Sequence, residues 1–331
     1  MVFYDMEAMK VVVTDDRYGS YAEENEVLKE IGVRVEVHNL GDEEQTIRVL
    51  EDADGILLNL HPLPATVIRR LNKCRVISRY GVGYDNVDVQ SATEKGIWIA
   101  RVPDYCLEDV SDQALALLLG CVRKVAFKDR RIREGAWNLH REQPSYRIAG
   151  KNLGLIGYGA IARTLHRKLS GFGLGRVLVF DPYLDAKKIT ENGAESVNLR
   201  TLLKNADFIS VHAPLNEQTR GLIGGRELSQ MKNSAILINT SRGPLLVENA
   251  VAEALAEGKI AAAGLDVFET EPLPEDSPLR KLDNIILSDH AGWYSEESVA
   301  ELKSKAAQNV LAVLKGEKPI YPVNHPASGS A

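Results

Sequence analysis

Four side chains in the second half of the sequence could together move a proton to or from a carbonyl oxygen. Arg242, the acids Asp266 and Glu271, and His290 each follow a short apolar run. If these runs are parallel strands, their carboxyl ends share the sheet edge at which open α/β sheets bind ligands. There the arginine would hold a substrate carboxylate, the histidine would donate a proton, and an acid would orient the imidazole and favour its charged form. A histidine alone after a strand is more often structural, so the prediction depends on this grouping.

A glycine-rich segment upstream predicts a dinucleotide site beside them. The segment 157–162 has the pattern G-x-G-x-x-A, between an apolar run and a helix-like stretch. Its glycines would let the backbone approach a pyrophosphate at a helix N-terminus. Asp181 lies 24 residues after Gly157, where an acid that binds ribose hydroxyls is expected and where it would repel the 2′-phosphate of NADP. The alternative is a structural turn with a capping aspartate; the motif and its context together favour NAD.

These residues belong to a series of apolar runs that alternate with helical segments. Strands are predicted at 153–157, 177–181, 208–212, 235–240, 261–267 and 285–288. The first hundred residues contain a similar series, with strands at 11–14, 33–37, 55–60, 76–78 and 97–100 and helices at 23–31 and 65–71. Such alternation is typical of parallel sheets.

Two long helices separate the two series. The strand rhythm stops near residue 102, and a helix is predicted from about 108 to 124. A second runs from about 296 to 315, with Gly316 as its C-terminal cap. We therefore predict an α/β protein of two doubly wound parallel-sheet units.

Composition excludes several other classes of protein. Of the 331 residues, 44% are hydrophobic and 26% charged, and the net charge of −6 argues against nucleic-acid binding. The longest apolar stretch, 114–122, is too short to cross a membrane, and the N-terminus has no basic segment typical of a signal peptide. Cys74, Cys106 and Cys121 have no metal-ligand spacing. These features predict a cytoplasmic protein without a metal site.

The sequence resembles the NAD-dependent D-2-hydroxyacid dehydrogenases over nearly its whole length. The motifs that carry the resemblance are 79–88, the glycine loop, 211–215, 239–243, 265–268 with 271–272, and His290. The resemblance implies a flavodoxin-like substrate domain and a Rossmann cofactor domain with an active-site cleft between them. Within the family, the segment 290–296, with Arg79 and Trp293, is most similar to the branch of the carboxy-terminal-binding transcriptional corepressors and their bacterial enzyme relatives.

The resemblance also implies roles for individual residues. Arg242, Glu271 and His290 match the catalytic residues, and Glu271 is preferred to Glu269 because the family's acid lies 29 residues after the arginine. Asp266 matches the contact to the nicotinamide amide. The implied substrate-binding residues are Arg79, Tyr80, Gly81, Val82, Gly83, Arg242 and Trp293, with the N–H groups of 80–83 on the substrate carboxylate. The implied cofactor-binding residues are Gly157, Gly159, Ala160, Ile161, Asp181, His212, Ala213, Pro214, Thr219, Thr240, Ser241, Arg242, Asp266, His290 and Gly292.

Domain organisation and assembly follow from the same resemblance. The substrate domain would be discontinuous, residues 1–102 with 297–331, and the NAD-binding domain would be 103–296. The segment 127–138 matches the family's dimerisation arm, which implies a homodimer; a solvated basic helix is the alternative. Ala160 stands where the family often has arginine, which removes one side-chain contact to the pyrophosphate but leaves the backbone donors.

The predicted function is interconversion of a 2-oxo acid and a D-2-hydroxy acid with NAD, with His290 as proton donor and acceptor. The predicted partners are this small substrate and a second copy of the chain, with no nucleic acid or membrane. An alternative of another class is an NAD-sensing, corepressor-like interaction protein with weak dehydrogenase activity, less favoured because the chain lacks long disordered tails. A 3-phosphoglycerate dehydrogenase would need further cations beside Arg79, the only one that the sequence places there.

Overall fold

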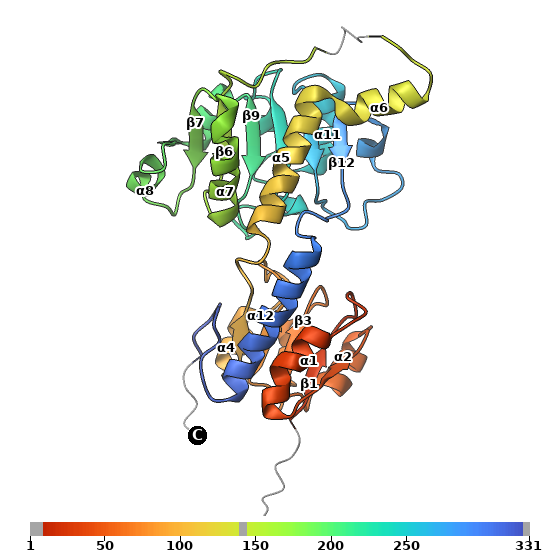
Figure 1. Ribbon diagram of the computed structural model, residues 1–331, viewed down its shortest axis with the longest axis vertical. Helices are drawn as coiled ribbons and strands as arrows, with labels where there is room; N and C mark the ends of the chain where they lie inside the picture. Colours follow the sequence, from red (N-terminus) through yellow and green to blue (C-terminus); the bar gives the residue numbers. More distant parts are fainter. Residues whose placement is uncertain (1–8, 139–143, 327–331) are drawn as a thin grey trace, which may run out of the picture. The chain divides into compact units, whose positions relative to one another are not determined.

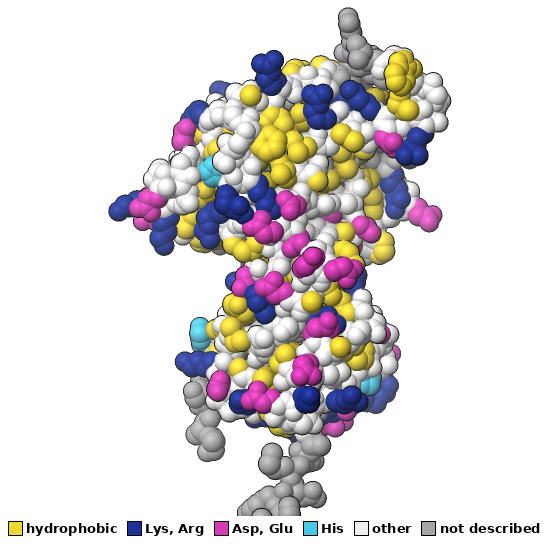
Figure 2. Space-filling view, viewed as in Figure 1, with side chains coloured by type: hydrophobic (Ala, Val, Ile, Leu, Met, Phe, Trp, Pro, Cys, Tyr) yellow, Lys and Arg dark blue, Asp and Glu magenta, His cyan; other side chains and the backbone are white. Residues whose placement is uncertain are grey.

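The computed structural model describes residues 9–138 and 144–326, which form two compact units (Figure 1). Unit 1 combines the chain up to Tyr105 with the chain from Ser295 onward, and unit 2 is Cys106–Tyr294. Within the described ranges, no helix is long and apolar enough to cross a membrane. On the face drawn in Figure 2, basic and acidic side chains are interspersed over both units.

Unit 1 is built on a five-stranded parallel sheet in the order β2-β1-β3-β4-β5. This is the flavodoxin-like order. Its strands are β1 (Val11–Val13), β2 (Val35–Val37), β3 (Gly55–Leu58), β4 (Val76–Arg79) and β5 (Trp98–Ala100). Its helices are α1 (Ala22–Leu28), α2 (Glu43–Leu50), α3 (Ala65–Ile68), α4 (Val89–Glu94) and α12 (Glu296–Leu314), with a 3-10 turn at Lys29–Ile31.

Close packing ties α12 to the sheet of unit 1. A Cβ atom added at Gly55 on β3 would lie 2.9 Å from Cγ1 of Val310, so the helix approaches the strand where no side chain intervenes. The other face carries α2, α3 and α4 over an apolar core that includes Leu50, Ile68 and Ile77. Both faces of the sheet are therefore covered, as buried parallel strands require.

Unit 2 contains a seven-stranded parallel sheet in the order β12-β11-β10-β9-β6-β7-β8. The strands are β6 (Leu153–Ile156), β7 (Val177–Phe180), β8 (Glu195–Ser196), β9 (Phe208–Val211), β10 (Ile236–Asn239), β11 (Ala262–Leu265) and β12 (Ile285–Leu287). The helices are α5 (Leu107–Arg123), α6 (Val125–Arg133), α7 (Ala160–Leu169), α8 (Ala186–Thr190), α9 (Leu199–Asn205), α10 (Gly225–Leu228) and α11 (Glu248–Ala256). Short 3-10 turns occupy Ser170–Phe172, Gly243–Leu245 and Pro278–Lys281.

Two apolar layers enclose this second sheet. Helices α5 and α7 lie side by side on one face, over a core that includes Leu117, Leu165 and Phe208 (Figure 1). Helices α9, α10 and α11 cover the other face, over a second apolar core that includes Leu202 and Leu228. The carboxyl ends of the strands are left for loops.

The predicted fold class, two parallel-sheet α/β domains, is confirmed. The strands predicted from apolar runs appear within two residues of their predicted limits, and α7 is the helix predicted after the glycine loop. The predicted helix 65–71 ends earlier, since α3 stops at Ile68. Gly316, with φ of 87°, follows the C-cap of α12 as expected.

Candidate functional site

His290 and Glu271 form a hydrogen-bonded pair at the carboxyl end of the unit 2 sheet. His290 follows β12, Glu271 follows β11, and 2.7 Å separates His290 Nδ1 from Glu271 Oε2. The second carboxylate oxygen, Oε1, accepts the Phe268 N–H at 3.0 Å. Both side chains are about one third exposed, at 33% and 35%. Because Glu271 holds Nδ1, Nε2 is the ring nitrogen left to exchange a proton with a ligand.

The surroundings of Glu271 keep it ionised. Burial acts to raise the pKa of this carboxyl group, but the hydrogen bonds from His290 and the Phe268 N–H, with the nearby charge of Arg242, outweigh it. The net result is a pKa below the usual value for glutamate. A carboxylate that stays charged is a suitable partner for an imidazolium.

Glu269 makes different contacts from Glu271. Its Oε1 accepts the N–H of Glu248 at 2.8 Å, and its own N–H donates to Glu248 Oε2 at 3.1 Å. These bonds hold the loop after β11 to the first residue of α11. The structure therefore brings Glu271, and not Glu269, to His290; that Glu271 is catalytic remains a prediction.

The backbone at His290 has an uncommon conformation. Its φ is 57°, in the left-handed region, and its N–H donates to the Asp266 carbonyl at 2.8 Å. The Asp266 side chain is almost fully buried and accepts hydrogen bonds from the Ser288 hydroxyl, the Ala291 N–H and the Gly292 N–H. Both oxygens of Asp266, predicted to contact the nicotinamide amide, are thus already engaged within the protein.

Arg242 lies in a tight turn after β10. Its Nη1 donates to the Ser241 carbonyl at 2.8 Å, and the Asn239 amide donates to the Arg242 carbonyl at 2.9 Å. The next residue, Gly243, packs against the chain after β11, because a Cβ there would lie 1.8 Å from the carbonyl carbon of Phe268. Only glycine fits at 243, and this contact brings the Arg242 turn close to the loop that carries Glu271.

The glycine loop has a geometry that suits a dinucleotide. Gly157 has a φ of 84°, and a Cβ there would lie 2.8 Å from the backbone N of Ala213. Gly159 is the N-cap of α7 without a side-chain cap, and nothing lies within 4 Å of its hypothetical Cβ. The N–H groups of the first turn, which include Ala160 and Ile161, therefore face an open approach that an anion could use.

Asp181 is fixed in orientation at the end of β7. Its Oδ2 accepts the Tyr158 N–H at 2.9 Å, and its Oδ1 accepts the N–H groups of Tyr183 and Leu184 at 3.0 and 3.1 Å. Each carboxylate oxygen has more than one acceptor site, so the side chain can still accept hydroxyl groups. Its position beside the glycine loop fits the predicted ribose contact.

The loop after β9 is fixed largely by its own hydrogen bonds. His212 Nε2 lies 2.8 Å from Ser210 Oγ, and burial lowers the pKa of His212 to about 4, so the ring is neutral near pH 7. The Thr219 hydroxyl donates to the Pro214 carbonyl at 2.6 Å. The predicted cofactor residues of this loop are therefore arranged before any ligand binds.

Two further predicted cofactor residues connect this loop to β10. The Ser241 hydroxyl donates to the Ala213 carbonyl at 3.0 Å. The hydroxyl of Thr240 is buried and has no hydrogen-bond partner among the described residues. Because buried polar groups are normally satisfied, Thr240 is available for a contact to a ligand.

In unit 1, the loop after β4 carries the predicted substrate residues. The N–H of Tyr80 donates to the Leu58 carbonyl at 2.7 Å, and the N–H of Gly81 donates to the Arg79 carbonyl at 3.0 Å. These two N–H groups are engaged within the protein. Of the four predicted donors to a substrate carboxylate, Val82 and Gly83 are those whose N–H groups find no acceptor in the described chain.

Arginine side chains hold this loop by its carbonyl groups. Arg79 Nη1 donates to the Tyr80 carbonyl, and Arg101 Nη1 donates to the Val82 carbonyl at 3.3 Å. The Arg101 guanidinium also lies 5.6 Å from the centre of the Tyr84 ring. Sequence reasoning missed Arg101, because its partners are a backbone carbonyl and an aromatic ring with no recognisable motif.

Trp293, Gln113 and Ser288 make further contacts around the unit 2 site. Trp293, predicted to bind substrate, packs edge-on against Tyr294, with ring centres 5.8 Å apart. Gln113 of α5 donates to Ser288 Oγ at 2.8 Å. No motif in the sequence indicates these Gln113 and Ser288 contacts. Among residues 9–138 and 144–326, no group of three or more His, Cys, Asp or Glu side chains could hold a metal ion.

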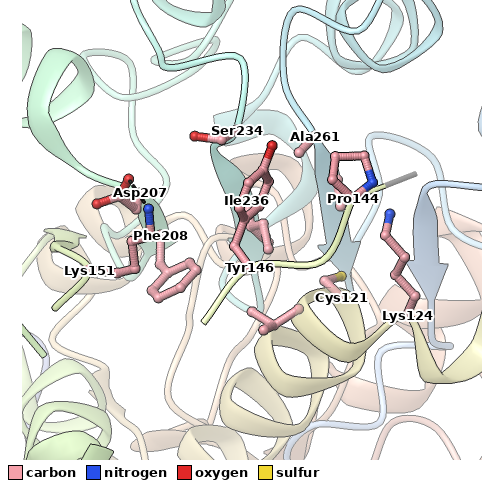
Figure 3. Close-up of a pocket in the computed structure, with 12 residues that line it drawn as sticks. Cys121, Lys124, Pro144, Tyr146, Lys151, Asp207, Phe208, Ser234, Ile236 and Ala261 are labelled. Carbon is pink, nitrogen blue, oxygen red and sulfur yellow. Dashed lines mark ion pairs between the residues drawn. The ribbon is translucent and has the colours of Figure 1, made fainter. Parts of the chain in front are cut away.

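A separate cavity lies at the opposite end of the unit 2 strands. It is lined by residues at the amino ends of β9, β10 and β11, among them Phe208 and Ile236 (Figure 3). Of its charged lining residues, Asp207 pairs with Lys151 at 3.9 Å and, outside the lining, with Lys232 at 2.9 Å. The cavity is therefore not part of the candidate site.

Known proteins similar to this chain agree with these features. Residues 115–292 match the family described as D-isomer specific 2-hydroxyacid dehydrogenase, NAD binding domain. A glyoxylate reductase of Korarchaeum cryptofilum is 40% identical over 84% of this chain and 85% of its own length. A D-3-phosphoglycerate dehydrogenase of Methanocaldococcus jannaschii is 37% identical over 96% of this chain, which spans 60% of that protein.

A solved structure shows the same likeness in three dimensions. The structure of D-lactate dehydrogenase from Aquifex aeolicus, complexed with NAD and lactic acid, has a TM-score of 0.86. It is 26% identical in sequence, and the match covers 96% of this chain and all of that one. The likeness therefore extends over both units and is not confined to the nucleotide loop.

Proposed function

We propose that this chain, which belongs to the family of D-isomer specific 2-hydroxyacid dehydrogenases, reduces a short 2-oxo acid such as glyoxylate or hydroxypyruvate. Membership of the family makes it an NAD(P)-dependent oxidoreductase that interconverts 2-oxo and D-2-hydroxy acids. The choice of a short substrate is supported by the 40% identity to a protein named glyoxylate reductase. The observation that carries the proposed mechanism is the 2.7 Å hydrogen bond between His290 and Glu271.

The proposed roles follow from the hydrogen bonds of the unit 2 site. NADH, when bound, supplies the hydride that the keto carbon accepts. Protonated His290 donates its Nε2 proton to the oxygen of the same carbonyl, which becomes a hydroxyl group as His290 becomes neutral. Glu271 keeps Nδ1–H hydrogen-bonded and stabilises the imidazolium before this transfer. Arg242 binds the substrate carboxylate through its planar guanidinium and polarises the carbonyl.

The proposed cofactor contacts divide between backbone and side chains. Gly157 and Gly159 let the chain approach the pyrophosphate, and the first turn of α7 donates N–H groups. Asp181 accepts the ribose hydroxyls and repels a 2′-phosphate, so NADH is preferred to NADPH. The neutral ring of His212 and the buried hydroxyl of Thr240 line the same site.

We also propose a role for each part of the chain. The substrate domain comprises residues 1–102 and 297–331 and contributes Arg79 and the loop 80–83, and the NAD-binding domain comprises 103–296. The segment 127–138 is the dimerisation arm, which is supported by the exposure of Ile132 (50%) and Trp137 (89%). The three cysteines are buried thiols outside any disulfide among the described residues, which agrees with the proposed cytoplasmic location.

A corepressor-like interaction protein is the weaker candidate. The similarity to that branch rests on the segment 290–296 and on Arg79 and Trp293. The relatives described above are named as reductases and dehydrogenases and give this finer placement no support. We therefore treat NAD sensing only as the outcome to expect if the chain proves inactive.

The test is reduction by the purified protein, followed through the loss of NADH absorbance. Glyoxylate, hydroxypyruvate, pyruvate and 3-phosphohydroxypyruvate are compared, each with NADH and with NADPH. We expect turnover of the first two, preference for NADH, and a D-configured product from hydroxypyruvate. Preference for the phosphorylated acid would replace the substrate proposal with a 3-phosphoglycerate dehydrogenase. Tight NADH binding without turnover of any acid would favour the interaction protein.

A further inference from the structure

A hydrogen-bonded cluster lies behind the His290 turn of unit 2. Asp266 after β11, Ser288 after β12 and Gln113 of α5 meet there from three different elements, and we call these three side chains the Asp266 anchor. The Ser288 hydroxyl donates to Asp266 Oδ1 at 2.6 Å. The Gln113 amide donates to Ser288 Oγ at 2.8 Å and lies 3.4 Å from Asp266 Oδ1. The buried carboxylate is thereby held by two neutral side chains.

Asp266 binds the backbone N–H groups of His290 and of the two residues that follow it. Asp266 accepts the Ala291 N–H at 3.2 Å and the Gly292 N–H at 2.9 Å through its side chain, and the His290 N–H at 2.8 Å through its carbonyl. These bonds close the turn in which His290 has a φ of 57°. A non-glycine residue keeps such a conformation only where its surroundings determine it.

Packing at Gly292 shows how tightly the turn and the Asp266 anchor fit. A Cβ at this position would lie 2.8 Å from Asp266 Oδ2 and 3.2 Å from Gln113 Cγ. A methyl group at 292 would therefore displace the turn from the carboxylate or move the carboxylate itself. Glycine is required at 292 because its backbone N–H bonds to Asp266 at a distance that leaves no room for a Cβ atom.

We propose that Gln113 and Ser288 are positioning residues that act through Asp266 to hold His290 in its left-handed conformation. That conformation keeps the imidazole on Glu271, at 2.7 Å. The inference rests on the proposed role of His290 in proton transfer. It also gives Asp266 a function besides the implied contact to the nicotinamide amide, because the carboxylate is 1% exposed and its oxygens accept bonds from the turn.

The first test replaces Gln113 by glutamate, which has nearly the same shape. Above the pKa of the new carboxyl group, its charge repels Asp266 and opens the anchor; below it, the protonated group donates to Ser288 as the amide did. We expect kcat of Gln113→Glu to fall about tenfold at mildly alkaline pH, as a small displacement of a catalytic group would cause. The ratio to the unchanged enzyme should rise again in mildly acidic solution.

A matched control uses the same change elsewhere in unit 2. Gln230 donates its side-chain amide to the Arg226 carbonyl at 3.1 Å. Gln230→Glu should leave the ratio of kcat values constant over the same pH range. A pH-dependent loss in both variants would show an effect of added charge in general and would overturn the assignment of Gln113.

The second test removes single contacts of the Asp266 anchor. Gln113→Ala and Ser288→Ala should each lower kcat about tenfold at every pH, because His290 is misplaced. The NADH dissociation constant should stay unchanged, and the primary isotope effect with deuterated NADH should increase. Ser288→Thr keeps the hydroxyl group and should restore most of the activity. Gly292→Ala should lower kcat to a similar extent, because its methyl group displaces the turn from Asp266.

The outcomes separate this inference from the proposed function. Unchanged kcat, isotope effect and pH profile in the Gln113 and Ser288 variants, with an inactive His290→Ala, would refute the positioning role alone. An active His290→Ala would refute the proposed function itself. If Gln113→Ala fails to fold, recovery of Gln113→Glu at low pH supports the proposal, and a pH-independent loss in that variant contradicts it.

Discussion

The two loops that carry the predicted chemistry, one in each unit, are fixed by different means. In unit 2, the turn 288–292 donates its N–H groups to the buried carboxylate of Asp266. In unit 1, the loop 80–84 is held by its carbonyl groups, to which Arg79 and Arg101 donate. The turn of unit 2 is therefore fixed by a negative charge that accepts its N–H groups, whereas the loop of unit 1 is fixed by positive groups on its carbonyls and keeps the N–H groups of Val82 and Gly83 for a ligand. The second arrangement suits a loop proposed to bind a carboxylate.

The buried acids behind the two loops, Asp266 and Glu24, differ in how many hydrogen-bond donors reach them. Glu24 in α1 is fully buried, and its Oε1 accepts the Tyr80 hydroxyl at 2.8 Å. Its Oε2 has no hydrogen-bond partner in the described chain, although Lys303 Nζ lies 3.7 Å away. Burial raises the pKa of Glu24 despite these contacts. Asp266, which several donors reach, thus fixes a stretch of backbone. Glu24, which few donors reach, instead makes the stability of unit 1 depend on pH.

The largest effect is expected from the histidine of the unit 2 turn. His290→Ala should lower kcat by a factor on the order of 10²–10⁴, the usual effect of a positioned proton donor. NADH affinity should be unchanged, because the imidazole meets the substrate oxygen. Steady-state reduction and a fluorescence titration with NADH test both statements. A kcat within a factor of about three of the unchanged enzyme would contradict the assigned proton donor.

The partner of the histidine should control the pH profile. Glu271→Gln keeps a hydrogen-bonding group but removes the charge that stabilises the imidazolium, so reduction should lose about tenfold near neutral pH and recover in acid. Glu269→Gln is the matched control, since Glu269 bonds to the backbone of Glu248. The measurement is kcat against pH for both variants. A shifted profile in the control alone would exchange the two assignments.

Loosening the loop 80–84 of unit 1 should weaken substrate binding. Arg101→Met removes the hydrogen bond to the Val82 carbonyl and the cation over Tyr84 but keeps an unbranched side chain. A lost charged hydrogen bond of about 1.5 kcal/mol corresponds to roughly a tenfold rise in KM, reduced by whatever mobility the loop already has. The NADH dissociation constant should not change. An unchanged KM would show that Arg101 does not position this loop.

The smallest expected effect is on the free energy of unfolding and tests the buried acid of unit 1, Glu24. The raised pKa of Glu24 means that its contribution to stability is present below about pH 4.5 and lost as the pH rises through the folded value. Glu24→Gln stays neutral and still accepts the Tyr80 hydroxyl. Its stability relative to the unchanged protein should therefore increase as the pH rises through the folded pKa of Glu24. Thermal unfolding over this range measures the difference.

The neighbouring acid provides a control with the opposite sign. The hydrogen bond from Lys303 is the main cause that lowers the pKa of Glu23. Its contribution to stability is present above the unfolded pKa and lost as the pH falls. Glu23→Gln should therefore become less stable than the unchanged protein as the pH rises. The same trend in both variants would contradict the distinction drawn between the two acids.

Most of the sheet framework could be predicted from the sequence. Buried parallel strands are continuous apolar runs, so β6 and β9 stand out from the polar segments around them. Helices α2, α4, α8, α9, α10 and α11 and strand β8 were not predicted individually. Strand β8 has two exposed residues and no apolar pattern, whereas α2 has a buried face but only eight residues. Tertiary contacts decide such elements more than local preference does.

The site could be predicted only where it follows motifs along the chain. Arg242, His290 and the glycine loop lie at strand ends, and their order fixes their place in the sheet. Position along the chain alone does not show which glutamate reaches His290, because the path of the loop after β11 decides it; only the family resemblance favoured Glu271. Gln113 contacts residues 153 and 175 positions away, and no local pattern indicates such a pair.

Because unit 1 combines residues before and after unit 2 in the sequence, synthesis on the ribosome completes it after unit 2. Helix α12 supplies Val310 against Gly55 and the Asn309 amide to the Arg101 carbonyl, and Asn324 accepts the Ile99 N–H. Until these residues emerge, one face of the N-terminal sheet lacks its cover. Unit 2 has all of its strands before then and can fold first. The nascent N-terminal segment must therefore wait while all of unit 2 and then α12 are translated, and during that time chaperones would have their clearest target.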